Sequence, residues 1–168
     1  MKQQWIGLAC RAALTSVWLT AGVLKFSDAA GTVRATRAFR LLPEALVPAF
    51  GHLLPVLELV IGACLLLGLL TRGFAALSAL LMVVFIVGVA SAWARGLEIQ
   101  CGCFGGGGNI KESATPGYIR DLLRDAGLLL ASAWLVWRPR TWLSLDNVLF
   151  RPFERSPDVD EEPATVQG

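Results

Sequence analysis

Two cysteines separated by one glycine, Cys101 and Cys103, are the residues whose types and spacing carry the most specific chemistry in this sequence. Thiol–disulfide exchange needs a thiolate that attacks a disulfide sulfur and a second, nearby thiol that releases the resulting mixed disulfide. This pair can fill both roles. A disulfide across a single residue departs from relaxed geometry and is easier to reduce, and Gly102 lets the backbone bend that far. The spacing differs from Cys-x-x-Cys, so it does not imply a thioredoxin mechanism.

A structural disulfide and a metal site are the other two interpretations of the pair. A closed zinc site needs four ligands, but the only histidine is His52. The remaining cysteines, Cys10 and Cys64, lie within apolar segments, where a cysteine usually behaves as a small apolar residue. We therefore expect no metal and favour redox activity, while a purely structural disulfide stays open.

The elements that must position this pair are membrane helices. Of the 168 residues, 55% are hydrophobic and only 17% are charged, whereas ordinary soluble domains have about 25% charged residues. A helix rises about 1.5 Å per residue, so about 20 residues cross the roughly 30 Å hydrocarbon core. The sequence predicts a transmembrane domain, residues 1–149, with four helices at about 5–26, 51–70, 74–94 and 116–138. Because Arg11 interrupts the first apolar run, we expect a retained helix there rather than a cleaved signal peptide.

The fourth predicted helix carries charges into or near the membrane. Its charge-free run, residues 126–137, measures only about 18 Å as a helix, so a spanning helix must begin before Arg124 and Asp125. Thr115 and Pro116 supply the start, since a hydroxyl caps the first turn and a proline costs no hydrogen bond at the first helical position. An arginine near the cysteines would favour the thiolate. We therefore assign Arg124 and Asp125 a supporting role at the dithiol.

Lys25 and Glu58 are a second pair of ionisable residues in the predicted helices. Ionisable groups at membrane depth are expensive and are functional or paired by default. Lys25 closes the first helix and Glu58 lies in the second, on the cysteine-loop side, so the two could pair and orient the bundle. Asp121 and Arg124 have the three-residue spacing that lets side chains meet on a helix. A purely structural network of ion pairs is an equally good interpretation of these charges.

Four helices place both termini on the same side of the membrane. Arg34, Arg37 and Arg40 occur at every third position and predict a short basic amphipathic helix at the interface, about residues 32–42. When these three are left out, the remaining lysines and arginines favour cytoplasmic termini and a periplasmic, oxidising side for the cysteine loop. Residues 150–168 are acidic and contain proline, which predicts a disordered tail.

Several short motifs accompany the cysteine pair along the chain. They are Gly22 with Lys25 and Phe26, Leu41-Leu42-Pro43, Pro55-Val56-Leu57-Glu58 with Gly62 and Leu66, Arg95-Gly96, Cys101-Gly102-Cys103-Phe104-Gly105 and Arg124-Asp125. Together they resemble the MauE/DoxX group of small four-helix membrane proteins, and its redox-associated MauE-type branch in particular. The resemblance covers roughly residues 5–137, and the Cys-Gly-Cys-Phe-Gly motif is its specific part. The glycine run at 105–108 and the acidic tail depart from the pattern.

The resemblance implies an all-α integral membrane four-helix bundle, similar to the vitamin K epoxide reductase type. It also implies a role in disulfide formation or cofactor maturation of exported proteins. In the methylamine-utilisation setting, such a protein supports assembly of a disulfide-rich dehydrogenase subunit together with a thioredoxin-like partner. We therefore expect a multi-pass protein of the bacterial inner membrane, with the lipid bilayer and an exported partner, but no nucleic acid, as its surroundings.

We expect this protein to pass electrons between a periplasmic thioredoxin-like partner, or an exported client, and a membrane acceptor. A quinone is a candidate acceptor, although no residue of the sequence demands it. Two other classes stay open. The protein can be a non-enzymatic assembly factor whose disulfide only fixes the loop, or a small-solute carrier with Glu58 and Arg124 along a polar path, although four short helices without repeats argue against transport.

Overall fold

The computed structural model of this protein describes residues 2–100, 108–109 and 115–138. The elements in chain order are α1 (Lys2–Ser27), α2 (Ala29–Ala38), α3 (Val47–Leu67), α4 (Thr71–Ala94), β1 (Ile99–Gln100), β2 (Gly108–Asn109) and α5 (Thr115–Trp137). The described chain is therefore all-α apart from two strands of two residues each. The predicted tail at 150–168 lies outside the described residues.

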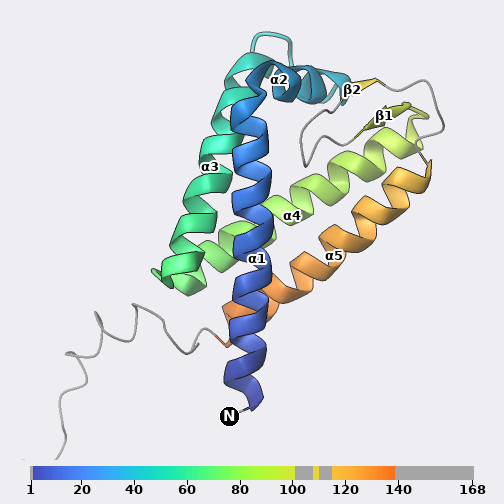
Figure 1. Ribbon diagram of the computed structural model, residues 1–168. Helices are drawn as coiled ribbons and strands as arrows, with labels where there is room; N and C mark the ends of the chain where they lie inside the picture. Colours follow the sequence, from blue (N-terminus) through green and yellow to red (C-terminus); the bar gives the residue numbers. More distant parts are fainter. Residues whose placement is uncertain (1, 101–107, 110–114, 139–168) are drawn as a thin grey trace, which may run out of the picture.

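The long helices form two pairs that meet at one end of the molecule and diverge toward the other (Figure 1). In the first pair α1 packs along α3, and in the second α4 packs along α5. At the wide end, α2 contacts α1 and α3 on one side and the β1–β2 hairpin on the other. The beginning of α1 and the end of α5 both lie at the opposite end from α2. At the wide end, residues of α2, α3 and α4 line a cavity.

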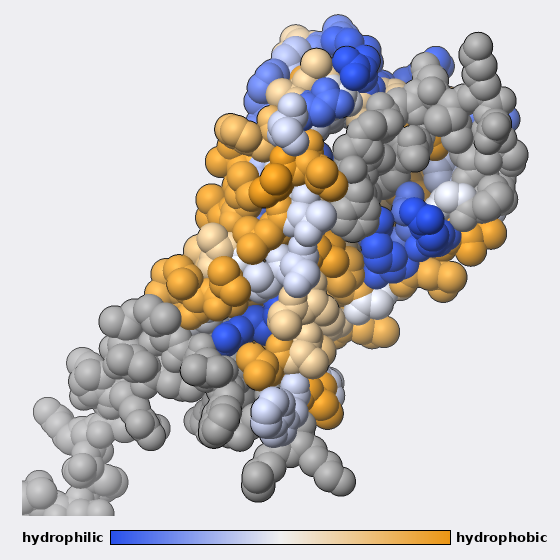
Figure 2. Space-filling model, viewed as in Figure 1, coloured by the Kyte–Doolittle hydropathy of each residue, from blue (hydrophilic) through white to orange (hydrophobic). Residues whose placement is uncertain are grey.

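Three helices of the described chain are long and apolar enough to cross a membrane. Their spans are Trp5–Ser27, Val47–Leu67 and Thr71–Ala94. Figure 2 shows apolar side chains over the outward side of α3 and hydrophilic ones gathered at the α2 end. The chain is therefore a multi-pass membrane protein. The helix α5 is long enough, but the charges in its first half keep it outside this set, so the fourth span stays a prediction.

The helix α2, which was predicted to lie at the membrane interface, begins at Ala29 and ends at Ala38, nearer the N-terminus than the predicted 32–42. Its start is set by Asp28, whose side chain accepts a hydrogen bond of 2.8 Å from the amide of Gly31. Its end is set by Arg40, which adopts a φ of 50° that cannot continue a right-handed helix. Asparagine, aspartate, serine and threonine are the usual N-caps, so Asp28 is the signal that locates this start.

The helix α3 also starts and ends earlier than the predicted 51–70. Pro48 lies in its first turn, where a missing amide proton costs no hydrogen bond. At the other end Gly68 adopts the left-handed conformation, with φ 65°, and its amide donates to Leu65 O. The amide of Leu69 donates to Cys64 O, which completes a Schellman-type cap. The apolar run continues past Gly68, and this explains why hydropathy alone placed the end three residues too late.

Glycines bring α1 and α3 into close contact. A Cβ atom added at Gly22 would lie 2.8 Å from Leu59 Cγ, and one added at Gly62 would lie 2.8 Å from Leu19 Cδ2. Both distances are shorter than real Cβ contacts. Small residues at membrane helix interfaces allow such close approach, and the packing it permits drives helix association. Gly22 and Gly62, which belong to the motifs identified in the sequence, therefore fix how α1 and α3 pack.

A buried chain of polar side chains joins α1, α4 and α5. Trp18 Nε1 donates to Ser78 Oγ at 2.8 Å, and Ser78 Oγ lies 3.0 Å from Ser132 Oγ. The Ser132 hydroxyl donates to the carbonyl of Leu128, so its single proton is used and Ser78 must donate to Ser132. Apolar side chains surround this chain of donors, among them Leu14, Ile61, Met82 and Leu135. The bundle core is thus ordered by directional bonds as well as by packing.

Candidate functional site

Two ion pairs from three helices meet inside the bundle. Lys25 Nζ on α1 contacts Glu58 Oε1 on α3. On α5, Arg124 donates to Asp125 Oδ1 from Nη2 at 2.8 Å and from Nε at 3.0 Å. All four side chains line one small cavity of about 20 Å³, together with Trp18 and Phe85. The structure thus brings together the four supporting residues predicted from the sequence.

We call these four side chains, Lys25, Glu58, Arg124 and Asp125, the charge cluster. Its two carboxylates are its most deeply buried members. Glu58 is 0% exposed and Asp125 is 1% exposed. Glu58 Oε2 and Asp125 Oδ2 have no hydrogen-bond partner among the described residues. Removing one member of a buried ion pair leaves an uncompensated charge, which is strongly destabilising. Removal of any one of the four charged side chains should therefore destabilise the helix bundle.

Two further contacts tie the charge cluster to its surroundings. Asp121 Oδ1 lies 3.3 Å from Arg124 Nη1, which is the i,i+3 pair expected from the spacing. The ammonium of Lys25 lies 5.3 Å from the centroid of the Phe85 ring, within the range of a cation–π interaction. Lys25 thus contacts α4 as well as α3.

Cys101 and Cys103 lie outside the described residues. The segment that contains them follows Gln100 and ends before Gly108, and these two residues are paired in the antiparallel β1–β2 ladder. The other pair of the ladder is Ile99 with Asn109. The chain on both sides of the dithiol segment is therefore held together at the α2 end of the molecule.

Tyr118 anchors this hairpin to α5. Its hydroxyl accepts a hydrogen bond of 3.1 Å from the amide of Ile99 and donates one of 2.5 Å to the carbonyl of Leu97. Its ring packs against Trp93, with 6.5 Å between the centroids. Tyr118 was not among the site residues predicted from the sequence. Its signal was weak: it is the only tyrosine of the chain, and it lies in the first turns of a helix with a recognisable start.

Three buried polar residues occur at seven-residue intervals along α5: Tyr118, Asp125 and Ser132. Because seven residues make nearly two helical turns, they lie on one face of the helix. Tyr118 holds the hairpin, Asp125 belongs to the charge cluster, and Ser132 ends the polar chain from Trp18. This spacing was readable in the sequence and would have identified the buried face of α5.

Arg95, the first residue after α4, joins that helix to the end of α2. Its Nη2 donates to Phe39 O at 2.5 Å, and its Nη1 lies 3.4 Å from Arg40 O. Basic side chains commonly bond the last carbonyls of a helix in this way. Gly96 follows with a φ of 63°, which suits glycine, and the chain then turns toward β1. The Arg95-Gly96 motif thus positions the start of the hairpin.

The other two cysteines are separate from this site. Cys10 and Cys64 are free thiols, and they lie in the first third of α1 and in the last turn of α3. Those helix ends lie opposite the hairpin (Figure 1). Within the part of the chain that the structure describes, no group of three or more His, Cys, Asp or Glu residues is placed to hold a metal ion.

A family model and a curated relative both match this chain, and they indicate the same family. Residues 3–138 match the family described as "Methylamine utilisation protein MauE". The chain is also 38% identical over 130 residues to the methylamine utilization protein MauE of Methylorubrum extorquens, a match that covers 76% of this chain and 66% of that protein. The chain therefore spans slightly less than two thirds of that relative. No solved structure matches the chain.

Proposed function

Since this chain belongs to the MauE family, we propose that it is a membrane redox protein that supports methylamine utilisation by thiol–disulfide exchange on an exported protein. The observation that carries the proposal is the Cys101-Gly102-Cys103 motif between two paired strands. The hairpin base is held by Tyr118, and a buried charge cluster lies further along the same face of α5. A close dithiol on an anchored hairpin suits an exchange reaction with a partner outside the membrane.

The proposed reaction oxidises a client dithiol. A client thiolate attacks the Cys101–Cys103 disulfide, which forms a mixed disulfide with one cysteine and releases the other as a thiolate. The second client thiolate then attacks the mixed disulfide, so the client gains a disulfide and this protein keeps two thiols. Two electrons and two protons must next leave the dithiol for an acceptor. We propose a periplasmic thioredoxin-like protein or the client itself as the donor and a membrane molecule as the acceptor.

The proposed architecture is a four-helix membrane bundle similar to the vitamin K epoxide reductase type, with α5 as the fourth span. At about 1.5 Å per residue, its 23 residues measure about 35 Å, which exceeds the hydrocarbon thickness. The helix packs along α4 and pairs its own charges Arg124 and Asp125, which lowers their cost inside a membrane. Lys25 and Glu58 orient the bundle, and Arg124 with Asp125 set the environment beneath the hairpin.

The proposed topology places the termini in the cytoplasm and the hairpin in the periplasm. A membrane-impermeant maleimide tests it in intact cells, using a Cys10→Ser/Cys64→Ser variant so that only Cys101 and Cys103 can react. Labelling that appears after mild reduction of intact cells supports an oxidised periplasmic pair. Labelling that requires lysis but no reductant would indicate the opposite topology, with the cysteine pair reduced and in the cytoplasm.

The functional test compares two double variants in the native bacterium. Cys101→Ser/Cys103→Ser should abolish methylamine-dependent growth and leave client cysteines reduced, whereas Cys10→Ser/Cys64→Ser should preserve both. The alternative of a non-enzymatic assembly factor, with a disulfide that only fixes the loop, predicts that growth survives the first double variant. That result would overturn the exchange mechanism.

A further inference from the structure

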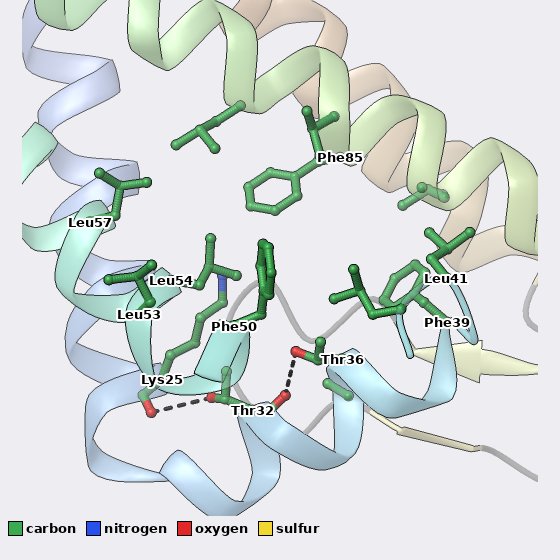
Figure 3. Close-up of a pocket in the computed structure, with 16 residues that line it drawn as sticks. Lys25, Thr32, Thr36, Phe39, Leu41, Phe50, Leu53, Leu54, Leu57 and Phe85 are labelled. Atoms are coloured by element: carbon green, nitrogen blue, oxygen red, sulfur yellow. Dashed lines mark hydrogen bonds between the residues drawn. The ribbon is translucent and has the colours of Figure 1, made fainter. Parts of the chain in front are cut away.

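A cavity of about 370 Å³ lies between α3 and α4 and is bounded at one end by α2 (Figure 3). Its volume is within the range of small-molecule sites, about 300–1,000 Å³. Apolar side chains form its walls, among them Phe39 just after α2, Phe50 and Leu53 of α3, and Phe85 of α4. Phe50 and Leu53 are 48% and 63% exposed, so the apolar wall continues onto the surface that faces lipid. A molecule dissolved in the bilayer can therefore enter from the side.

Lys25 provides the polar group of this cavity. Figure 3 shows its side chain extending from α1, with the nitrogen directed into the space beside Leu54 and Phe50. Lys25 is 4% exposed, and an ammonium has three protons to donate. Among the described residues, Glu58 Oε1 is the only hydrogen-bond acceptor of Nζ. The ammonium thus keeps donor capacity for a ligand at the inner end of an apolar cavity.

The two hydroxyls of the cavity wall do not offer protons. Thr32 Oγ1 donates within reach of the carbonyls of Lys25 and Asp28, at 3.2 and 3.1 Å. Thr36 Oγ1 donates to Thr32 O at 2.9 Å, as drawn in Figure 3. A ligand must therefore present a hydrogen-bond acceptor to Lys25 on an otherwise apolar body.

The cavity wall is also part of the packing beneath the dithiol hairpin. Phe39 and Val89 line the cavity; Val89 belongs to the buried cluster that contains Ile99 and Tyr118, and Phe39 packs against that cluster. Ile99 lies two residues before Cys101. A molecule in the cavity therefore touches side chains that pack with Ile99 and Tyr118, at the base of the β1–β2 hairpin.

We propose that this cavity binds the ring of a membrane quinone, with a ring carbonyl accepting a hydrogen bond from Lys25 Nζ. The inference rests on the proposed function, because the dithiol supplies the electrons. A quinone combines a flat ring that suits Phe39, Phe50 and Phe85, a carbonyl acceptor for the ammonium, and an apolar tail that leaves between α3 and α4. A phospholipid acyl chain could fill the apolar walls but would leave the ammonium unused.

The proposed step couples oxidation of the dithiol to reduction of the quinone. The thiols of Cys101 and Cys103 lose two electrons and two protons as their S–S bond forms. The quinone gains two electrons and two protons and becomes a quinol, which leaves through the side opening. The Lys25 ammonium stabilises negative charge that develops on the carbonyl oxygen as electrons arrive.

A binding experiment tests the site without relying on the thiols. The full chain is placed in quinone-free phosphatidylcholine nanodiscs and titrated with decylubiquinone, and an azido-quinone analogue is cross-linked and mapped by mass spectrometry. We expect saturable binding and cross-links on the cavity-facing residues of α3 or α4. Cross-links confined to residues that do not line the cavity, or no saturable binding, would overturn the proposal, and this readout needs no variant.

Gly88→Leu is the variant that fills the cavity. A Cβ at Gly88 would lie 3.9 Å from Leu41 Cδ1 and 4.0 Å from Phe39 Cε1, so a larger side chain extends into the space those residues line. We expect at least about tenfold weaker binding. Gly73→Leu on the same helix is the matched control, since no atom lies within 4 Å of its added Cβ, and its affinity should be unchanged. Equal affinity in both variants contradicts the proposal.

A second variant removes the donor without leaving a charge unpaired. Lys25→Met/Glu58→Leu should weaken binding about tenfold or more, as expected for loss of a hydrogen bond to a charged group. The Cys101→Ser/Cys103→Ser protein should bind the quinone normally but not reduce it. Quinone binding without mixed-disulfide formation would keep this site and reject the proposed function, whereas mixed disulfides without quinone binding would do the reverse.

Discussion

Lys25 and Glu58 form an ion pair between α1 and α3 in which both side chains are buried. The pair crosses the same helix interface that Gly22 and Gly62 hold at close distance. Glycine contacts allow the helices to approach, and a single buried pair of opposite charges has one position along that interface at which it can form. The sequence motifs at these positions thus specify how α1 and α3 pack.

Single and double substitutions of this ion pair should differ in how much they destabilise the protein. Lys25→Met leaves a buried carboxylate unpaired and should lower the free energy of unfolding by about 3–5 kcal/mol. Lys25→Met/Glu58→Leu removes both charges and should be close to neutral, since apolar replacement of buried pairs often is. Thermal unfolding in detergent measures both. A double variant at least as unstable as the sum of the two single variants would show that the charges do not act as a pair.

Gly22→Ala tests the close approach of α1 and α3. The added methyl group would meet Leu59 and should cost about 1–3 kcal/mol through overpacking. Gly127→Ala on α5 is the control, because nothing lies within 4 Å of its added Cβ. That control should be neutral or stabilising, since alanine favours helix by about 1 kcal/mol over glycine. Equal effects in the two variants would argue against a glycine-dependent interface.

Ser78→Ala tests the polar chain through the core. Without the hydroxyl, Trp18 Nε1 loses its acceptor inside the bundle, which should cost about 1–3 kcal/mol. Ser16→Ala is the matched control, because the Ser16 hydroxyl is exposed and bonds only its own helix at Ala12 O. Stability of purified protein in detergent is the readout. If both alanine variants unfold at the same temperature as the wild type, the hydrogen bonds through Ser78 do not stabilise the fold.

Tyr118→Phe tests whether the tyrosine hydroxyl holds the hairpin. The variant keeps the ring against Trp93 but removes the partner of the Ile99 amide and the Leu97 carbonyl. A lost hydrogen bond of about 1.4 kcal/mol corresponds to tenfold faster exchange of the Ile99 amide if local opening controls it. Hydrogen exchange followed by mass spectrometry measures this. Unaltered exchange at residues 97–100 would show that the Tyr118 hydroxyl does not hold the hairpin.

The all-α fold and the membership of the MauE family were predictable from the sequence, and both are confirmed. Apolar runs located the three long spans because hydrophobic length is a direct requirement of the bilayer. The rule that intramembrane charges are paired indicated Lys25 and Glu58 as partners. The helix ends were less accurate, because Asp28 and Gly68 set them by local capping rather than by hydropathy.

The features that the sequence did not indicate depend on how helices meet in space. The short β1–β2 ladder carries almost no intrinsic signal and forms where α2, α4 and α5 bring the chain together. Tyr118 became visible only through its bonds to residues 97 and 99, about twenty positions away in the chain. The cavity arises because α3 and α4 diverge from their common turn, and no single segment encodes that angle.

Trapping of mixed disulfides tests whether Cys101 and Cys103 carry out thiol–disulfide exchange. Cys101→Ser and Cys103→Ser, each in a Cys10→Ser/Cys64→Ser background, are expressed in the native bacterium and quenched with acid and alkylating agent. We predict that one of the two variants accumulates a reductant-sensitive adduct with an exported or thioredoxin-like protein, while the variant lacking all four cysteines accumulates none. Absence of an adduct from both single-cysteine variants would contradict thiol–disulfide exchange by this pair.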